Sequence, residues 1–251
     1  MNKIKVVFLD MGNTLLHFHK GKSDDEKDIE GLKLLTQYLN KFNENITLEE
    51  VKNNFFVSWM NGIKDRRLTF KEYPIENFLN QFLEKYNIEL NINECIEAIN
   101  IFYTEYRENV YFENNIYYTL KNLRALGYKI GVISNTCYYD EVMKECFKKA
   151  GIFDLIDSFT FSYSLKAGKP HKEIFNQALK KMNVLANEAI MIGDNLNSDI
   201  KPAKEIGMYT ILFNKNNEEL SSEIIPDDII TDLSEVPICL NRKFNNNRSN
   251  L

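Results

Sequence analysis

Residues 6–15 of the chain read Val-Val-Phe-Leu-Asp-Met-Gly-Asn-Thr-Leu. The first four residues are apolar and bulky, which predicts a short buried β-strand. Asp10 follows at the end of this strand, and Gly12 and Asn13 favour a tight turn because both residue types tolerate left-handed backbone. The stretch therefore presents one carboxylate at the tip of a buried strand, which suits a nucleophile.

Polar residues take similar positions three more times along the chain. They follow the apolar runs 130–133 and 189–192 or lie in the loop between these runs, as Ser134-Asn135, Lys169-Pro170 and Gly193-Asp194, with Asp199 five residues further on. Ligands bind at the carboxyl ends of the strands in open α/β sheets, so we expect these groups to converge on one crevice.

This set of groups suits phosphoryl transfer. Asp10 can attack phosphorus and form an aspartyl phosphate, which divides one difficult step into two easier ones. Mg²⁺ between Asp10 and Asp194 would remove the repulsion between the carboxylate and the phosphate, since Mg²⁺ prefers a few hard oxygen ligands. Lys169 would add a positive charge, and Ser134 and Asn135 would donate hydrogen bonds to the phosphate oxygens.

The order and spacing of these residues resemble the four motifs of the haloacid dehalogenase superfamily, most of whose members are Mg²⁺-dependent phosphatases. In that family the first motif reads Asp-x-Asp-Gly-Thr, the second ends in Ser or Thr, often followed by Asn, the third carries Lys-Pro, and the fourth is Gly-Asp-x-x-x-x-Asp. The matching stretches here are Asp10-Met11-Gly12-Asn13-Thr14, Ser134-Asn135, Lys169-Pro170 and Gly193-Asp194-Asn195-Leu196-Asn197-Ser198-Asp199. They extend over most of the chain.

The resemblance implies a set of site residues. The expected metal ligands are Asp10, the backbone carbonyl of Gly12, and Asp194. The expected catalytic residues are Asp10, Lys169 and Ser134, and the substrate-binding residues are Ser134, Asn135, Lys169 and Asn13. We expect three further residues to position these groups without touching the metal or substrate: Asp199, Asn195 and Thr14. Asp199 would orient a metal-bound water or hold Lys169, and the alternative is a carboxylate satisfied by the N-terminus of a helix.

Position 12 departs from the family pattern. The family has there a second aspartate, which protonates the leaving oxygen and later activates water, whereas this chain has Gly12. Loss of general acid catalysis typically costs about 10²–10⁴-fold in rate, which predicts a slow phosphatase or an acid from elsewhere. His17 and His19 are the nearest titratable candidates, although nothing in their spacing aims them at the site.

A helical segment separates the first motif from the second. Ser23–Glu26 and Thr47–Glu50 have the pattern of capping boxes, and apolar residues recur at helical spacing as Ile29, Leu32, Leu35 and Leu39 and as Ile75, Phe78, Leu79, Phe82 and Leu83. The segment resembles the helical cap that the family inserts after its first strand (the C1 type). The pair Arg66-Arg67 is read either as contacts for a second anionic group or as a solvated helix end.

Strands and helices alternate after residue 114. Strands are expected at 129–133, 158–161, 189–192, 209–213 and 229–230, with helices between them. This alternation predicts an α/β fold, a Rossmann-like parallel sheet with helices on both faces, plus the all-helical cap. We expect residues 1–18 and 112–240 to form the catalytic core, residues 19–111 the cap, and residues 241–251 a flexible tail.

Composition limits the remaining possibilities. The 251 residues carry a net charge of −5 and no basic stripe with interleaved aromatics, so a nucleic-acid partner is not expected. No apolar run is long enough for a membrane span, and Asp10 interrupts the first apolar run, so no signal peptide is expected. Four cysteines without metal-ligand spacing favour a reduced, cytoplasmic setting, and the protein is expected to be a monomer or a homodimer.

Three functions stay open from the sequence. The first is a Mg²⁺-dependent phosphatase of a small phosphorylated metabolite, which works through an aspartyl phosphate and is slow because of Gly12. The second is a metal-independent dehalogenase of 2-haloacids, in which Asp10 displaces halide and no acid is needed, although the Gly193-Asp194 pair argues for a metal. The third is a binding or regulatory protein with little turnover.

Overall fold

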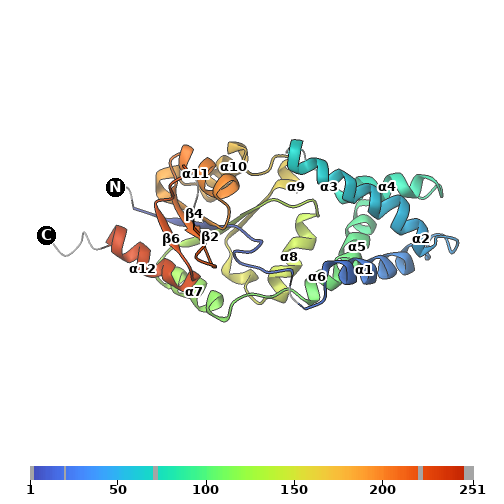
Figure 1. Cartoon of the computed structure of the whole chain (residues 1–251), viewed down its shortest axis with the longest axis horizontal. Coiled ribbons are helices and arrows are strands. Elements are labelled where there is room, and N and C mark those ends of the chain that lie inside the picture. The colour runs from blue at the N-terminus through green and yellow to red at the C-terminus, as the bar shows by residue number, and fades with distance from the viewer. Residues whose placement is uncertain (1–2, 20, 70–72, 220–222, 246–251) are drawn as a thin grey trace.

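The computed structural model describes residues 3–19, 21–69, 73–219 and 223–245. Its centre is a six-stranded parallel sheet in the order β3-β2-β1-β4-β5-β6 (Figure 1). The strands are β1 (Val6–Leu9), β2 (Lys129–Ser134), β3 (Ser158–Phe161), β4 (Ala189–Gly193), β5 (Tyr209–Phe213) and β6 (Asp228–Ile230). The predicted α/β fold class is confirmed, and each expected strand is present within about one residue of its predicted bounds.

The first strand lies in the middle of the sheet because all four of its residues are apolar and can be buried on both faces. Leu9 pairs in register with Val132 of β2 and with Ile192 of β4. The carboxyl ends of the three strands are therefore level with one another. This alignment brings the polar residues that follow β1, β2 and β4 to one edge of the sheet.

Helices cover both faces of the sheet. Val7 and Leu9 belong to the apolar cluster that includes α7 and α8, whereas Val6 and Phe8 face the cluster formed with α10 and α11, as the two-residue period of a strand requires. In Figure 1, α10 and α11 lie above the sheet and α7 and α12 below it. The core helices are α7 (Asn114–Ala125), α8 (Asp140–Lys149), α9 (Ser162–Leu165), α10 (Lys172–Met182), α11 (Lys201–Glu205) and α12 (Val236–Leu240).

A second group of helices lies beyond the carboxyl edge of the sheet, at the right of Figure 1. It consists of α1 (Asp24–Leu39), α2 (Leu48–Glu50), α3 (Val57–Thr69), α4 (Ile75–Glu84), α5 (Ile92–Phe102) and α6 (Thr104–Glu108), with a π-helical stretch at Val51–Phe56. Both predicted capping boxes, at Ser23 and at Thr47, are present. We call residues 19–111 the cap.

One predicted core position of the cap is wrong. Ile29 is 42% exposed, whereas Leu32, Leu35 and Leu39 of the same stripe are buried. Gly31, two residues further along α1, explains why the buried face of the helix does not include Ile29. A Cβ atom at Gly31 would lie 2.3 Å from the carbonyl oxygen of Phe102, so α1 meets α5 along the side that contains Gly31 and turns Ile29 outward.

The chain crosses between the core and the cap twice, and the two crossings are bonded to each other. The His17 amide donates to the Tyr111 carbonyl at 2.7 Å, and the Tyr111 amide donates back to the His17 carbonyl at 3.0 Å. This short antiparallel ribbon lies close to the limits 18 and 112 expected for the cap. Within the described residues, no helix has both the length and the apolar character needed to cross a bilayer.

The structure describes the first part of the expected flexible tail, residues 241–245. Residues Asn241–Asn245 continue the chain as a helical turn after α12, and the Phe244 ring packs edge-on against Tyr209 of β5 at 5.1 Å. This contact explains the order, because Phe244 is the one large apolar residue of the segment before Leu251. The rest of the predicted tail, residues 246–251, lies outside the described residues.

Candidate active site

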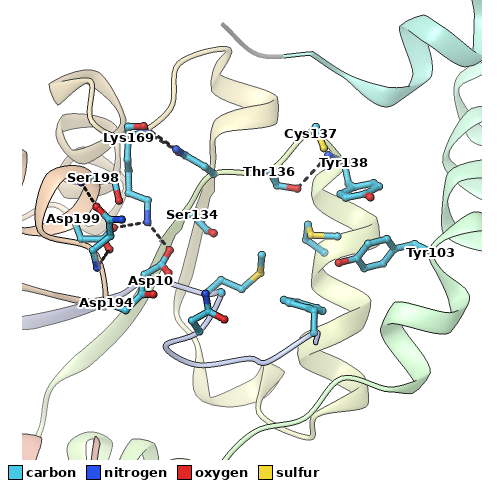
Figure 2. A pocket seen from close by; sticks show the side chains of 17 residues that line it. Asp10, Tyr103, Ser134, Thr136, Cys137, Tyr138, Lys169, Asp194, Ser198 and Asp199 are labelled. Atoms are coloured by element: carbon cyan, nitrogen blue, oxygen red, sulfur yellow. Dashed lines mark hydrogen bonds and ion pairs between the residues drawn. The ribbon is translucent and has the colours of Figure 1, made fainter. Parts of the chain in front are cut away.

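The polar residues at the strand ends line one cavity of about 420 Å³. Asp10 and Asp194 follow β1 and β4, Ser134 ends β2, and Lys169 comes from the loop between α9 and α10. Figure 2 shows these side chains together on one wall, with the ends of the strands behind them. The convergence expected from the sequence is therefore present.

Lys169 links two of the carboxylates on this wall. It is buried, and its Nζ donates to Asp10 Oδ1 at 2.5 Å and to Asp199 Oδ1 at 2.6 Å (Figure 2). Burial opposes the positive charge, but the charges of Asp10 and Asp199 outweigh it and hold the pKa of Lys169 above its ordinary value. The ammonium group therefore stays charged beside Asp10. Of the two functions expected for Asp199, the geometry is that of holding Lys169.

Asn135 makes a different contact from the one expected. Its Nδ2 donates to the Lys169 carbonyl at 2.8 Å, and its Oδ1 accepts from the Lys169 amide at 2.7 Å. The side-chain amide is thus occupied with the backbone of Lys169. These two hydrogen bonds position the lysine loop. Both Ser134 and Asn135 line the cavity, and their contacts with phosphate stay predictions.

Three carboxylates lie close enough together to hold a cation. Oxygens of Asp10, Asp194 and Asp199 lie within 4.8 Å of one another. Both oxygens of Asp199 are already used, by Lys169 and by the Asn195 amide at 3.1 Å. Asp10 and Asp194 are left, and desolvation together with the Asp10 charge raises the pKa of Asp194. A divalent cation would relieve this repulsion, so the donor set fits Mg²⁺.

The loops around these carboxylates hold them in place. Asn13 has a left-handed backbone with φ of 59°, as its residue type predicted, and its side chain hydrogen-bonds to Asp194. Asn195 caps the turn at 196–200 by accepting from the amides of Asn197 and Ser198. Thr14 is fully buried and does not line the cavity, and its hydroxyl has no partner among the described residues.

A sequence model of the haloacid dehalogenase-like hydrolases matches residues 4–207, which include all of the site residues above. The chain belongs to the haloacid dehalogenase-like hydrolases. It is 35% identical over 119 residues to the glyceraldehyde 3-phosphate phosphatase of Methanocaldococcus jannaschii, a match that covers 47% of this chain and 51% of that protein. The Pyrococcus furiosus protein of the same name is 34% identical over 130 residues, or 50% of this chain and 52% of that one. The chain thus spans about half the length of the curated relatives it matches.

Solved structures agree on the fold. A 2-haloacid dehalogenase from Pseudomonas syringae superposes with a TM-score of 0.69 at 23% identity, over 95% of this chain and 99% of that one. A haloacid dehalogenase-like phosphatase from Thermococcus onnurineus gives a TM-score of 0.62 at 22% identity, over 96% of this chain and 100% of that one. At these identities the likeness concerns the fold alone.

Gly12 differs from the usual residue of this hydrolase family and leaves open space in the cavity. A Cβ atom at Gly12 would meet nothing within 4 Å. Neither His17 nor His19 is among the described residues that line this cavity. His19 is exposed and pairs with Asp24 at 2.8 Å, and His17 pairs through its backbone with Tyr111. Both histidines therefore lie outside the cavity that contains Asp10, and His17 lines a neighbouring pocket together with Asn13 and Asp194.

The wall opposite the carboxylates is apolar and aromatic, and the sequence did not reveal it. It consists of Phe18, Tyr103, Cys137, Tyr138 and Met143. Tyr103 comes from the cap and Tyr138 from the core, and their ring centroids lie 4.5 Å apart. The available signal was that Cys137 and Tyr138 lie three and four residues after Ser134. Tyr103 could not be singled out, because the sequence around it reads as an ordinary helical stripe of aromatic and apolar residues.

Proposed function

We propose that this hydrolase is a Mg²⁺-dependent phosphatase of a small phosphorylated metabolite. The observation that carries the proposal is the contact of Lys169 with both Asp10 and Asp199, beside a second carboxylate, Asp194, whose pKa is raised by desolvation and by the charge of Asp10. This arrangement gives a nucleophile, a positive charge for the phosphate and a place for a metal in one cavity. The two archaeal relatives named glyceraldehyde 3-phosphate phosphatase support the same reaction class.

In the proposed reaction an oxygen of Asp10 attacks phosphorus, the bond to the leaving oxygen breaks, and water then hydrolyses the aspartyl phosphate. Lys169 and the Ser134 hydroxyl bind the phosphoryl oxygens, and Asp199 and Asn135 keep Lys169 in position. Asp10, Asp194 and the Gly12 carbonyl would hold Mg²⁺, which supplies positive charge that offsets the repulsion between nucleophile and phosphate.

The proposed substrate is small because the cavity itself is small. About 420 Å³ accommodates a phosphate and a compact organic group. Among the described cavity residues, Lys169 is the only cationic side chain. The side chains of Arg66 and Arg67, the pair considered for a second anionic group, lie outside the described residues. The four free, buried cysteines support the proposal of a reduced, cytoplasmic setting.

The test measures phosphate release from an aryl phosphate with and without Mg²⁺. We expect release in the wild type, loss on chelation, and loss in Asp10→Asn, while Asp25→Asn on the exposed face of α1 keeps full activity. As a readout independent of turnover, Mg²⁺ should raise the Tm of the wild type but not of Asp194→Asn. Release of halide from a 2-haloacid without Mg²⁺ and without phosphate release would replace this proposal with the dehalogenase.

A further inference from the structure

The family's usual acid is missing at position 12, yet hydrolysis of an alkyl phosphate needs one. When the phosphorus–oxygen bond of such an ester breaks, the leaving alkoxide is a strong base and must receive a proton. Asp194 and Asp199 lie on the side of the cavity away from the cap (Figure 2), and Lys169 is bound to two carboxylates. The donor must therefore come from elsewhere on the cavity wall.

Within the described part of the chain, Tyr103 is the cap side chain that lines the same cavity as Asp10. It follows α5 at the inner side of the cap, is only 5% exposed and lines the cavity. Figure 2 shows its hydroxyl directed from the cap toward the wall that contains Asp10. Among the residues that the structure describes, none forms a hydrogen bond with this hydroxyl. A buried phenol that faces a polar cavity without a protein partner is free to bind substrate.

The ring of Tyr103 is held firmly. It stacks on the Tyr106 ring with 5.1 Å between the ring centroids and 13° between the ring planes. Its centroid lies 4.5 Å from that of Tyr138 and 6.2 Å from that of Phe18. Tyr106 is itself anchored, since its hydroxyl donates to Asp28 at 3.0 Å. These contacts keep the Tyr103 hydroxyl at one point of the cavity, as a group that must meet a reacting atom requires.

We propose that Tyr103 donates a proton to the leaving oxygen of the substrate and so replaces the acid absent at Gly12. As Asp10 attacks phosphorus, the phosphorus–oxygen bond breaks and the Tyr103 proton moves to the departing oxygen, which leaves as an alcohol. The water that hydrolyses the aspartyl phosphate then gives a proton back to the phenolate. Burial raises the pKa of Tyr103 well above its ordinary value, so the hydroxyl keeps its proton until an alkoxide forms.

The inference rests on the proposed phosphatase function and is tested by comparing leaving groups. Tyr103→Phe keeps the ring contacts and removes only the hydroxyl. We expect kcat/KM for alkyl phosphates to fall about 10²-fold, while nitrophenyl phosphate, whose leaving group needs no proton, is hydrolysed at nearly the wild-type rate. Tyr38→Phe is the matched control, because Tyr38 is a cap tyrosine of the same 5% exposure that does not line the cavity.

Rescue gives a second readout that a structural defect would not produce. There is room for a side chain at position 12, so Gly12→Asp should restore alkyl phosphate hydrolysis in the Tyr103→Phe background and add little to the wild type. Equal losses for alkyl and aryl esters in Tyr103→Phe would overturn the inference. The same selective loss in Tyr138→Phe or Cys137→Ser, with Tyr103→Phe unaffected, would also overturn it.

The wild type alone provides a further check. Proton donation makes kcat/KM depend weakly on the basicity of the leaving group, so a steep dependence would contradict the inference even if Tyr103→Phe fails to fold. If the wild type releases phosphate from neither ester class with Mg²⁺, the proposed function fails. If it hydrolyses both and Tyr103→Phe changes both alike, only the inference about Tyr103 fails.

Discussion

Gly193 shows how one missing side chain shapes the site. An ideal Cβ at Gly193 would lie 2.4 Å from Asp199 Oδ2, so the carboxylate that holds Lys169 occupies the space of a side chain at this position. The glycine before Asp194 is thus required by packing against Asp199. The family motif Gly-Asp-x-x-x-x-Asp therefore has a direct physical reason in this chain.

Gly193→Ala is expected to displace Asp199 and free Lys169. Overpacking of this kind costs about 1–3 kcal/mol, and the proposed phosphatase activity should fall by about tenfold or more because Lys169 loses one of its two anchors. Urea unfolding and steady-state kinetics measure the two effects. Gly12→Ala, whose Cβ would meet nothing within 4 Å, should leave the urea midpoint unchanged. Equal midpoints for both variants would contradict this account.

At this scale the sequence predicted the charged residues well and the neutral ones poorly. Asp10, Lys169, Asp194 and Asp199 could be named because each follows a strand or lies in a loop of fixed spacing. The contact of Asn135 with the Lys169 backbone could not, since an amide offers the same donor and acceptor to a phosphate and to a peptide. Tyr103 could not either, because its position depends on how the cap folds over the core.

Helices α1 and α5 form the closest pair in the cap, and Gly31 is the point of contact. We expect Gly31→Ala to destabilise the protein by about 1–3 kcal/mol, because its Cβ would clash with the backbone oxygen of Phe102 and no side chain can rotate away. The urea midpoint measures this loss. A gain in stability, as a better helix former would give at an open position, would show that the two helices can separate without cost.

Helix α1 also contains a carboxylate that opposes folding at neutral pH. Burial raises the pKa of Asp28 from 3.8 to about 6, although its hydrogen bond with Tyr106 acts in the opposite direction. The folded protein therefore holds this proton more tightly than the unfolded chain does, and stability falls as the pH rises from about 4 to about 6.

Asp28→Asn should therefore raise the Tm at pH 7, because the amide is neutral and its oxygen still accepts from Tyr106. The gain should disappear near pH 4, where Asp28 is protonated in the folded state. Thermal unfolding of both proteins at the two pH values checks this. A gain of the same size at both would mean that the charge of Asp28 is not its cause.

The elements themselves were largely predictable, for physical reasons that differ between the two parts. Strands such as β1 and β4 are wholly buried, so they appear as uninterrupted apolar runs. Capping boxes fixed where α1 and α2 begin. The buried face of α1 was misjudged at Ile29. The spacing of apolar residues does not reveal that α5 packs closely against Gly31 and so turns Ile29 toward solvent.

The cap and the core of the whole molecule are joined at a rim far from the chain crossings. The Tyr163 hydroxyl of α9 donates to Glu76 Oε1 of α4 at 2.6 Å, and the Ile75 amide donates to the Cys137 carbonyl at 3.1 Å. Burial raises the pKa of Glu76, and its Oε2 is buried without a hydrogen-bond partner among the described residues. Tyr163 is therefore the main donor that this carboxylate has.

Tyr163→Phe is expected to destabilise the protein by about 1–3 kcal/mol, since it leaves the Glu76 carboxylate without its donor. Replacing both partners, as in Glu76→Leu with Tyr163→Phe, should recover most of the loss. A double-mutant cycle of urea unfolding measures the coupling. Additive losses would show that the two side chains do not depend on each other.

The ribbon formed by His17 and Tyr111 joins the two chain crossings between the cap and the core, so we expect a rotation of the cap to turn about it. Helices α5 and α6 pack against α8 on that side, whereas α4 and α9 meet on the other. Such a rotation would separate α4 from α9 and carry Tyr103 away from Asp10. A metabolite would then enter and leave the cavity between α4 and α9, beside Ile75 and Glu76. The rotation that closes this opening would also return Tyr103 to the cavity.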